Sequence, residues 1–85
     1  MTYRVELTNA AKRELLKLEA NIRERVLAAI RALADNPRPS GCVKLEGRDG
    51  GYRIRVGDYR IVYHINDPAL LVRVVKIAHR REVYR

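Results

Sequence analysis

The stretch YRIRVGDYRIVY, residues 52 to 63, alternates apolar and basic side chains on both sides of Gly57-Asp58. A Gly-Asp dipeptide between two such runs is typical of a two-residue β-hairpin, and the alternation is typical of strands with one buried face. Pairing across this turn places Arg55 directly opposite Arg60. The sequence therefore predicts a hairpin with one apolar face and one face rich in arginine.

The predicted register sorts the side chains of the hairpin by face. The face suited to packing against helices carries Tyr52, Ile54, Val56, Tyr59, Ile61 and Tyr63. The other face carries Arg53, Arg55, Arg60, Val62 and His64. Directly opposed like charges destabilise neighbouring strands, so we expect solvent or a polyanion to compensate the arginines. Guanidinium groups match phosphate oxygens, and three on a rigid sheet suit a site for a scissile phosphate. A plain solvated strand face is the alternative reading.

The N-terminal residues predict one strand followed by a helix. Residues 2 to 7 alternate polar and apolar side chains, as in a half-buried strand. From residue 11 to residue 18, apolar side chains recur at helical spacing, while charged side chains occupy the remaining positions. Thr8 or Asn9 can cap this short amphipathic helix.

A second amphipathic helix is predicted after a break near Ala20. Asn21 and Glu24 have the spacing of a capping box, and an apolar stripe follows them until Asn36-Pro37 ends the pattern. The two helices would form a hairpin that covers one face of the sheet.

The rest of the chain predicts further strands. Residues 38 to 51 are rich in Gly and Pro and form a connection, with one short extended piece at Val43 to Leu45. Asn66-Asp67-Pro68 predicts the next turn, and Leu70 to Ile77 predicts a last strand that is apolar on both faces apart from two basic residues. Such a strand is expected at the centre of a sheet.

These elements define the expected fold. A chain of 85 residues without internal repeats makes one small domain, so we expect residues 1–85 to form a single domain. Its class is α+β: an N-terminal strand, a helical hairpin, and then a twisted antiparallel sheet of about three further strands.

Composition limits the partners and the compartment. The chain has 18 Lys and Arg against 10 Asp and Glu, a net charge of +8, which favours polyanionic partners. Its one cysteine, Cys42, excludes an internal disulfide and lacks the spacing of a zinc site. No apolar run is long enough for a signal peptide or a membrane span, so we expect a cytoplasmic protein without membrane contact.

The C-terminal segment AHRREVYR adds candidate functional residues. Arg80 and Tyr84 could bring a guanidinium and a phenol to the arginine face, although a terminal Tyr is more often a packing anchor. Of the two histidines, His79 is the better proton carrier because it adjoins Arg80, although a surface role is the more common one. No carboxylate cluster, Gly-rich phosphate loop or catalytic triad can be inferred, so we expect any phosphate chemistry to be metal-free.

Three motifs together resemble the RelE toxins of the RelE/ParE superfamily of type II toxin–antitoxin systems. They are KLEG, residues 44 to 47, YRIRVGDYRIVY, residues 52 to 63, and IAHRREVYR, residues 77 to 85. The resemblance spans nearly the whole chain and implies the same order of elements. It also implies an endoribonuclease that cleaves messenger RNA in the ribosomal A site and stops translation until an antitoxin protein neutralises it.

The resemblance assigns roles by position. Arg53 and Arg55 fall where the family has basic catalytic residues, often lysines, and Arg60 falls on the arginine that stabilises charge on the phosphate. Arg80 matches the arginine after the last strand, and Tyr84 matches the tyrosine that stacks on or positions the nucleotide. Further RNA contacts are expected from Lys44, His79 and Arg81. Arginine does not lose its proton in proteins, so proton transfer is left to Tyr84 or His79.

The implied reaction is attack of the ribose 2′-OH on the adjacent phosphate, without metal or cofactor. We expect little activity on naked RNA, because much of the rate must come from alignment that the ribosome provides. The antitoxin is expected to carry an amphipathic, partly acidic segment. Two alternatives remain: a ParE-like inhibitor of DNA gyrase, and a protein that binds RNA or the ribosome without cleavage.

Overall fold

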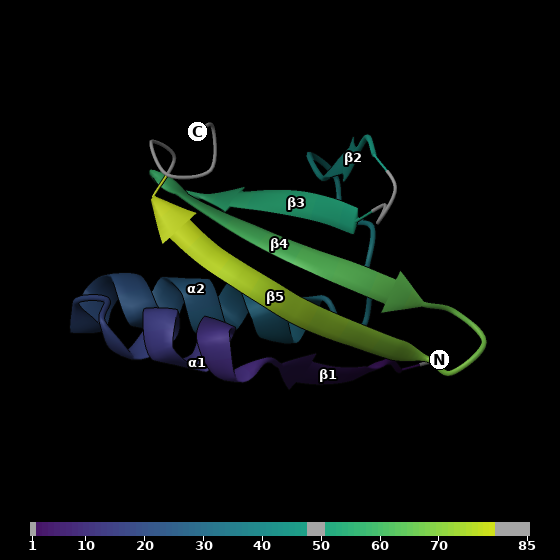
Figure 1. Cartoon of the computed structure of the whole chain (residues 1–85), viewed down its shortest axis with the longest axis horizontal. Coiled ribbons are helices and arrows are strands. Elements are labelled where there is room, and N and C mark those ends of the chain that lie inside the picture. The colour runs from purple at the N-terminus through teal and green to yellow at the C-terminus, as the bar shows by residue number, and fades with distance from the viewer. Residues whose placement is uncertain (1, 48–50, 80–85) are drawn as a thin grey trace.

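The computed structural model describes residues 2–47 and 51–79. The elements in chain order are β1 (Arg4–Leu7), α1 (Asn9–Leu16), α2 (Ala20–Ala32), β2 (Val43–Leu45), β3 (Gly51–Val56), β4 (Tyr59–Asn66) and β5 (Leu71–His79). The strands form one sheet in the order β1-β5-β4-β3-β2, and both helices lie on the same face of that sheet (Figure 1). The α+β class and the predicted order of elements are confirmed.

The sheet is mixed, and the strands that follow the helices are antiparallel to one another, as expected. β1 runs parallel to β5, and the remaining neighbours are antiparallel. Parallel neighbours need a long crossover, and the chain between β1 and β5 supplies one that includes both helices. The short extended piece at Val43–Leu45 is a true strand, so four strands follow the helices. β5 lies between β1 and β4, which agrees with its expected interior position.

The β3–β4 hairpin has the predicted register. Tyr52 pairs with Tyr63, Arg55 with Arg60, and all intervening pairs follow the same register. Gly57 has a φ of 59°, and Asp58 is not among the described non-glycine residues with positive φ. A positive φ at the first central residue alone is the pattern of a type II′ turn, which matches the twist of the strands.

The helix caps follow the sequence only in part. Thr8 is the N-cap of α1, and its Oγ1 accepts a hydrogen bond from the Ala11 amide at 3.2 Å. The predicted capping box at Asn21 is wrong, because α2 begins at Ala20 after the N-cap Glu19. The Asn21 Oδ1 instead accepts from the amide of its neighbour Ile22 at 2.9 Å. A side chain with this local partner does not cap the helix.

The hydrophobic core lies between the helices and the sheet. Its fully buried large side chains are Tyr63, Leu33, Ile61, Ile77, Val26, Val72 and Val74. The hydroxyl of Tyr63 donates a 2.8 Å hydrogen bond to the carbonyl of Pro37, just after α2. The core therefore anchors the connection that leads from α2 to β2. Neither helix is long and apolar enough to cross a membrane in the part of the chain described.

Candidate functional site

Three arginines of the hairpin line one cavity. Arg53 and Arg55 of β3 and Arg60 of β4 line a space of about 230 Å³, and Gly41 and Val43 also line it. The register explains the convergence, because Arg55 is directly opposite Arg60 and Val43 of β2 is directly opposite Arg53. We call this space the arginine cavity. The sequence predicted the convergence of the three arginines but not the two residues from the β2 side.

Arg60 has an unusual environment for a cation. Arg60 is 6% exposed. Among the described residues, it is the one charged residue that is buried. Its neighbour on β5 is the small, buried Ala78, while its neighbour on β3 is Arg55. A guanidinium keeps its charge even when it is buried. A buried charge interacts more strongly with an anion than the same charge in bulk water.

The other two arginines are more accessible. Arg55 is exposed, and its Nε donates to the carbonyl of Gly57 in the turn at 3.3 Å. Arg53 is half-buried beside β2. The exposure of the three cations therefore increases from Arg60 through Arg53 to Arg55. Such a gradient suits a site that a phosphate enters from solvent. All three groups stay protonated, so they can stabilise negative charge but cannot transfer protons near neutral pH.

Lys44 and His79 lie away from the arginine cavity. Lys44 is opposite Tyr52, and His79 is opposite Tyr59, so both alternate onto the face that carries these tyrosines. The rings of Tyr59 and His79 meet edge to face at 5.5 Å. Neither residue lines the cavity that the three arginines form. The predicted residues Arg80, Arg81 and Tyr84 lie outside the described part of the chain.

A polar cluster fixes the connection that supplies Gly41 and Val43. Arg38 binds Asp67 with Nη2 at 2.9 Å, and its Nε donates to the Tyr52 hydroxyl at 3.2 Å. The Tyr3 hydroxyl donates to Asp67 at 2.6 Å. Hydrogen bonds from Arg38 and then from Tyr3 lower the pKa of the Asp67 carboxyl. The cluster ties together the residue before β1, the connection after α2, β3 and the β4–β5 turn.

No group of three His, Cys, Asp or Glu side chains that could hold a metal ion is found within residues 2–47 and 51–79. The chemistry that the described site offers is electrostatic. It combines three fixed cations with a cavity large enough for a small anionic group.

The comparisons with known proteins point to one family. The family model for the ParE toxin of the type II toxin–antitoxin system parDE matches residues 5–84. Toxin RelG of Mycobacterium tuberculosis is 33% identical over 86 residues, covering 100% of this chain and 99% of that protein. Toxin RelE of the same organism is 33% identical over 84 residues, covering 98% of this chain and 87% of that protein.

A solved structure also has this fold. A chain of the archaeal RelE–RelB complex from Pyrococcus horikoshii superimposes with a TM-score of 0.84 and 32% sequence identity. The match covers 94% of the present chain and 97% of that one. The similarity therefore extends over most of the chain.

Proposed function

The chain belongs to the RelE/ParE superfamily of toxins from type II toxin–antitoxin systems and is most like RelE, and from this premise we propose that it is a ribosome-dependent endoribonuclease. In this proposal it cleaves messenger RNA in the ribosomal A site and so inhibits translation in the cytoplasm. The observation that carries the proposal is the convergence of Arg53, Arg55 and Arg60 on one cavity.

The proposed reaction uses these cations to stabilise developing charge. The ribose 2′-OH attacks the adjacent phosphorus, and the bond to the 5′-oxygen of the next nucleotide breaks, which leaves a 2′,3′-cyclic phosphate and a 5′-OH. The phosphate gains negative charge in the transition state, so fixed cations lower the barrier. Arg60, which is buried beside Arg55, contributes the strongest field, and Arg80 of the tail adds a fourth cation.

Proton transfer requires a different side chain. The arginines remain protonated, and His79 alternates onto the other face of the sheet. Tyr84 is therefore the preferred proton carrier, or it stacks on the nucleotide. With so few groups that titrate near neutral pH, the rate must depend on alignment of the 2′-OH with the leaving oxygen. The ribosome would supply that alignment.

A cognate antitoxin is the expected protein partner, since a similar solved structure is a RelE–RelB complex. We propose that an amphipathic, partly acidic segment of this partner folds on the toxin and covers the arginine cavity. Opposite charges favour this contact, given the net charge of +8.

The test is a map of new 5′ ends on a model message, with and without ribosomes. Wild type should cut only when ribosomes are present, and Arg55→Gln should slow cutting about 10²–10³-fold, as loss of one charge-stabilising donor does. Tyr84→Phe should slow cutting without loss of ribosome binding. Arg31→Gln removes an exposed cation from α2 and should cut normally. Equal cutting of naked RNA, or normal cutting by Arg55→Gln, would contradict the proposal.

A second candidate is inhibition of DNA gyrase, because the matching family model is that of a ParE toxin. Induction of such a protein would cause double-strand DNA breaks, whereas the proposed nuclease would stop translation first.

A third candidate binds RNA without cleaving it. In that case Arg60→Ala would reduce ribosome binding rather than abolish a cleavage step.

A further inference from the structure

The face of the sheet away from the helices carries basic residues well beyond the arginine cavity. Along the described strands, the basic side chains on this face are Arg4, Arg53, Arg55, Arg60, Arg73 and Lys76, and the acidic one is Glu6. Lys76 lies opposite Val62, and Arg73 lies opposite His64, so the charges follow β4 and β5 away from the arginine cavity. A polyanion is attracted along the whole face.

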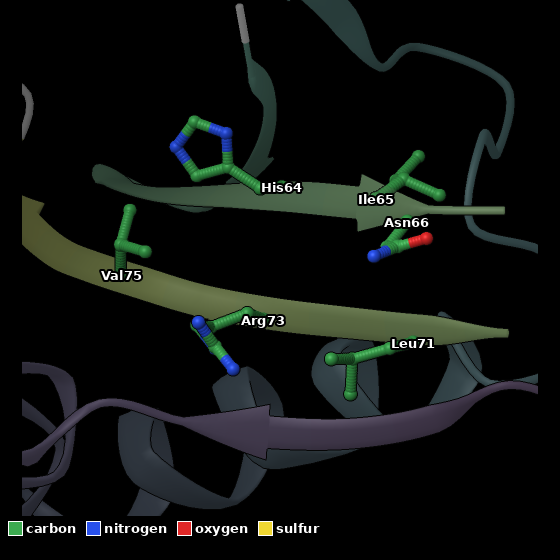
Figure 2. A pocket seen from close by; sticks show the side chains of 6 residues that line it. All are labelled: His64, Ile65, Asn66, Leu71, Arg73 and Val75. Atoms are coloured by element: carbon green, nitrogen blue, oxygen red, sulfur yellow. The ribbon is translucent and has the colours of Figure 1, made fainter. Parts of the chain in front are cut away.

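A second cavity lies on this face, about four residues along β4 from Arg60. Its volume is about 440 Å³, and Figure 2 shows the side chains that line it: His64, Ile65, Asn66, Leu71, Arg73 and Val75. A volume of this size is within the range of small-molecule sites. The rise of a strand places the Arg60 and His64 backbones roughly 13 Å apart, a span that a short oligonucleotide can bridge.

A β-bulge shapes the floor of this second cavity. Val62 pairs with Lys76 and Tyr63 pairs with Val74, so Val75 is an extra residue of β5. The bulge lets Val75 line the cavity while its neighbour Lys76 also alternates onto the same face. The result is an apolar floor next to a cation, which suits a sugar or base with its phosphate alongside.

His64 has room at this cavity because Gly51 has no side chain. A Cβ added to Gly51 would lie 3.2 Å from Cε1 of His64 and 3.2 Å from the carbonyl oxygen of Tyr63. Figure 2 shows His64 on β4 and Arg73 on β5 at opposite edges of the cavity. An imidazole ring at such a position can stack on a nucleotide base.

Arg73 is available to bind an anion. Its side chain is 54% exposed, and it forms an exposed ion pair with Glu6, in which its Nη2 is 3.6 Å from Oε2, a distance longer than a hydrogen bond. Glu6 is engaged more closely by Arg4, at 3.0 Å. Arg73 can therefore turn its planar guanidinium toward phosphate oxygens.

We propose that this second cavity is an RNA subsite that binds a nucleotide of the same strand whose scissile phosphate enters the arginine cavity. Arg73 binds the phosphate of that nucleotide, His64 stacks on its base, and Val75 contacts the sugar. Lys76 neutralises a phosphate between the two cavities. The inference deepens the proposed function and rests on it for the identity of the polyanion as RNA.

The test measures the affinity of 2′-O-methyl RNA, which cannot be cleaved by 2′-OH attack, at low ionic strength by fluorescence anisotropy. A dinucleotide is too short to fill both cavities, and an octanucleotide can reach both. His64→Ala should weaken octanucleotide binding at least about fivefold and leave unchanged the dinucleotide, which binds in the arginine cavity. Arg73→Gln should also weaken the octanucleotide and reduce the salt slope by about one, while Arg73→Lys keeps the slope. Arg31→Gln on α2 is the charge-matched control and should change neither affinity.

Octanucleotide affinities that do not change in His64→Ala and Arg73→Gln would overturn the inference, as would equal losses for both RNA lengths. The result separates this inference from the proposed function. If wild type cuts message on ribosomes and neither variant changes RNA affinity, only the second subsite fails. If both variants weaken the octanucleotide and wild type does not cut, only the nuclease proposal fails.

Discussion

Tyr63 allows a sharp test of how the core holds the connection to β2. Its side chain is 0% exposed, its hydroxyl donates to the Pro37 carbonyl at 2.8 Å, and its ring stacks on Tyr52 at 5.9 Å. Tyr63→Phe keeps the ring and removes the donor. A buried acceptor that loses its donor lowers the free energy of unfolding by about 1–3 kcal/mol. For a domain of this size, the Tm should fall by roughly 5–20 °C.

Tyr52→Phe is the matched control. It also removes one tyrosine hydroxyl from the stacked pair, but that hydroxyl accepts an exposed hydrogen bond from Arg38 at 3.2 Å. Exposed substitutions of this kind usually change the free energy of unfolding by less than about 0.5 kcal/mol. Thermal and urea unfolding of both variants at pH 7, followed by circular dichroism, gives the comparison.

The pH dependence provides a second readout. Burial, with a smaller effect of the Cys42 thiol, raises the pKa of Tyr63. A folded-state pKa above the unfolded value means that the contribution of Tyr63 to stability is complete below pH 10 and falls as the pH rises further. Wild type should therefore lose more stability than Tyr63→Phe between pH 9 and pH 11, so the difference in the free energy of unfolding between the two proteins narrows.

Two results would refute this reasoning. The first is a Tyr63→Phe variant that is no less stable than Tyr52→Phe at pH 7, which would mean that the buried hydrogen bond contributes nothing net. The second is a gap that stays constant up to pH 11, which would mean that Tyr63 ionises as easily in the folded protein as in the unfolded chain.

Three further predictions concern local features. Gly57→Ala should lower the free energy of unfolding by about 1–2 kcal/mol in urea titrations, because a residue with a Cβ resists the φ of 59° in the turn. Thr8→Ala should lower it by about 1 kcal/mol, because the N-cap of α1 is lost, and Thr8→Ser should restore most of it. Asp67→Asn should lower the Tm slightly at pH 7. Arg38 depresses the folded-state pKa of Asp67, so this difference should vanish as melting is repeated in increasingly acidic buffers.

The hairpin could be predicted from sequence because its determinants are local. A Gly-Asp turn fixes the register, and alternation fixes the faces, so the opposition of Arg55 and Arg60 follows without knowledge of the rest of the fold. The α1 cap at Thr8 was predictable for the same reason. Local signals that compete are less informative. Asn21 and Glu24 fit a capping box, yet α2 begins at Ala20.

Features set by distant contacts were not predictable. The parallel pairing of β1 with β5 joins residues more than sixty positions apart, and no local pattern marks it. β5 is rich in apolar residues on both faces, so its sequence does not reveal that Val75 is the bulged position. The register of the three-residue strand β2 places Val43 at the arginine cavity and Lys44 on the other face. A shift of one residue would have exchanged them.

The hairpin links the fold and the candidate site through one variable, its register. Three cations reach one cavity because Ile54 and Ile61, on the other face, are held in the core at 8% and 0% exposure. A slip of one residue would turn one strand over, which would expose its isoleucine and bury an arginine against the helices. Burial of those isoleucines therefore opposes the repulsion between Arg55 and Arg60, and it keeps the cations in place before any phosphate binds. An anion that enters the cavity relieves that repulsion, so binding and hairpin stability should rise together.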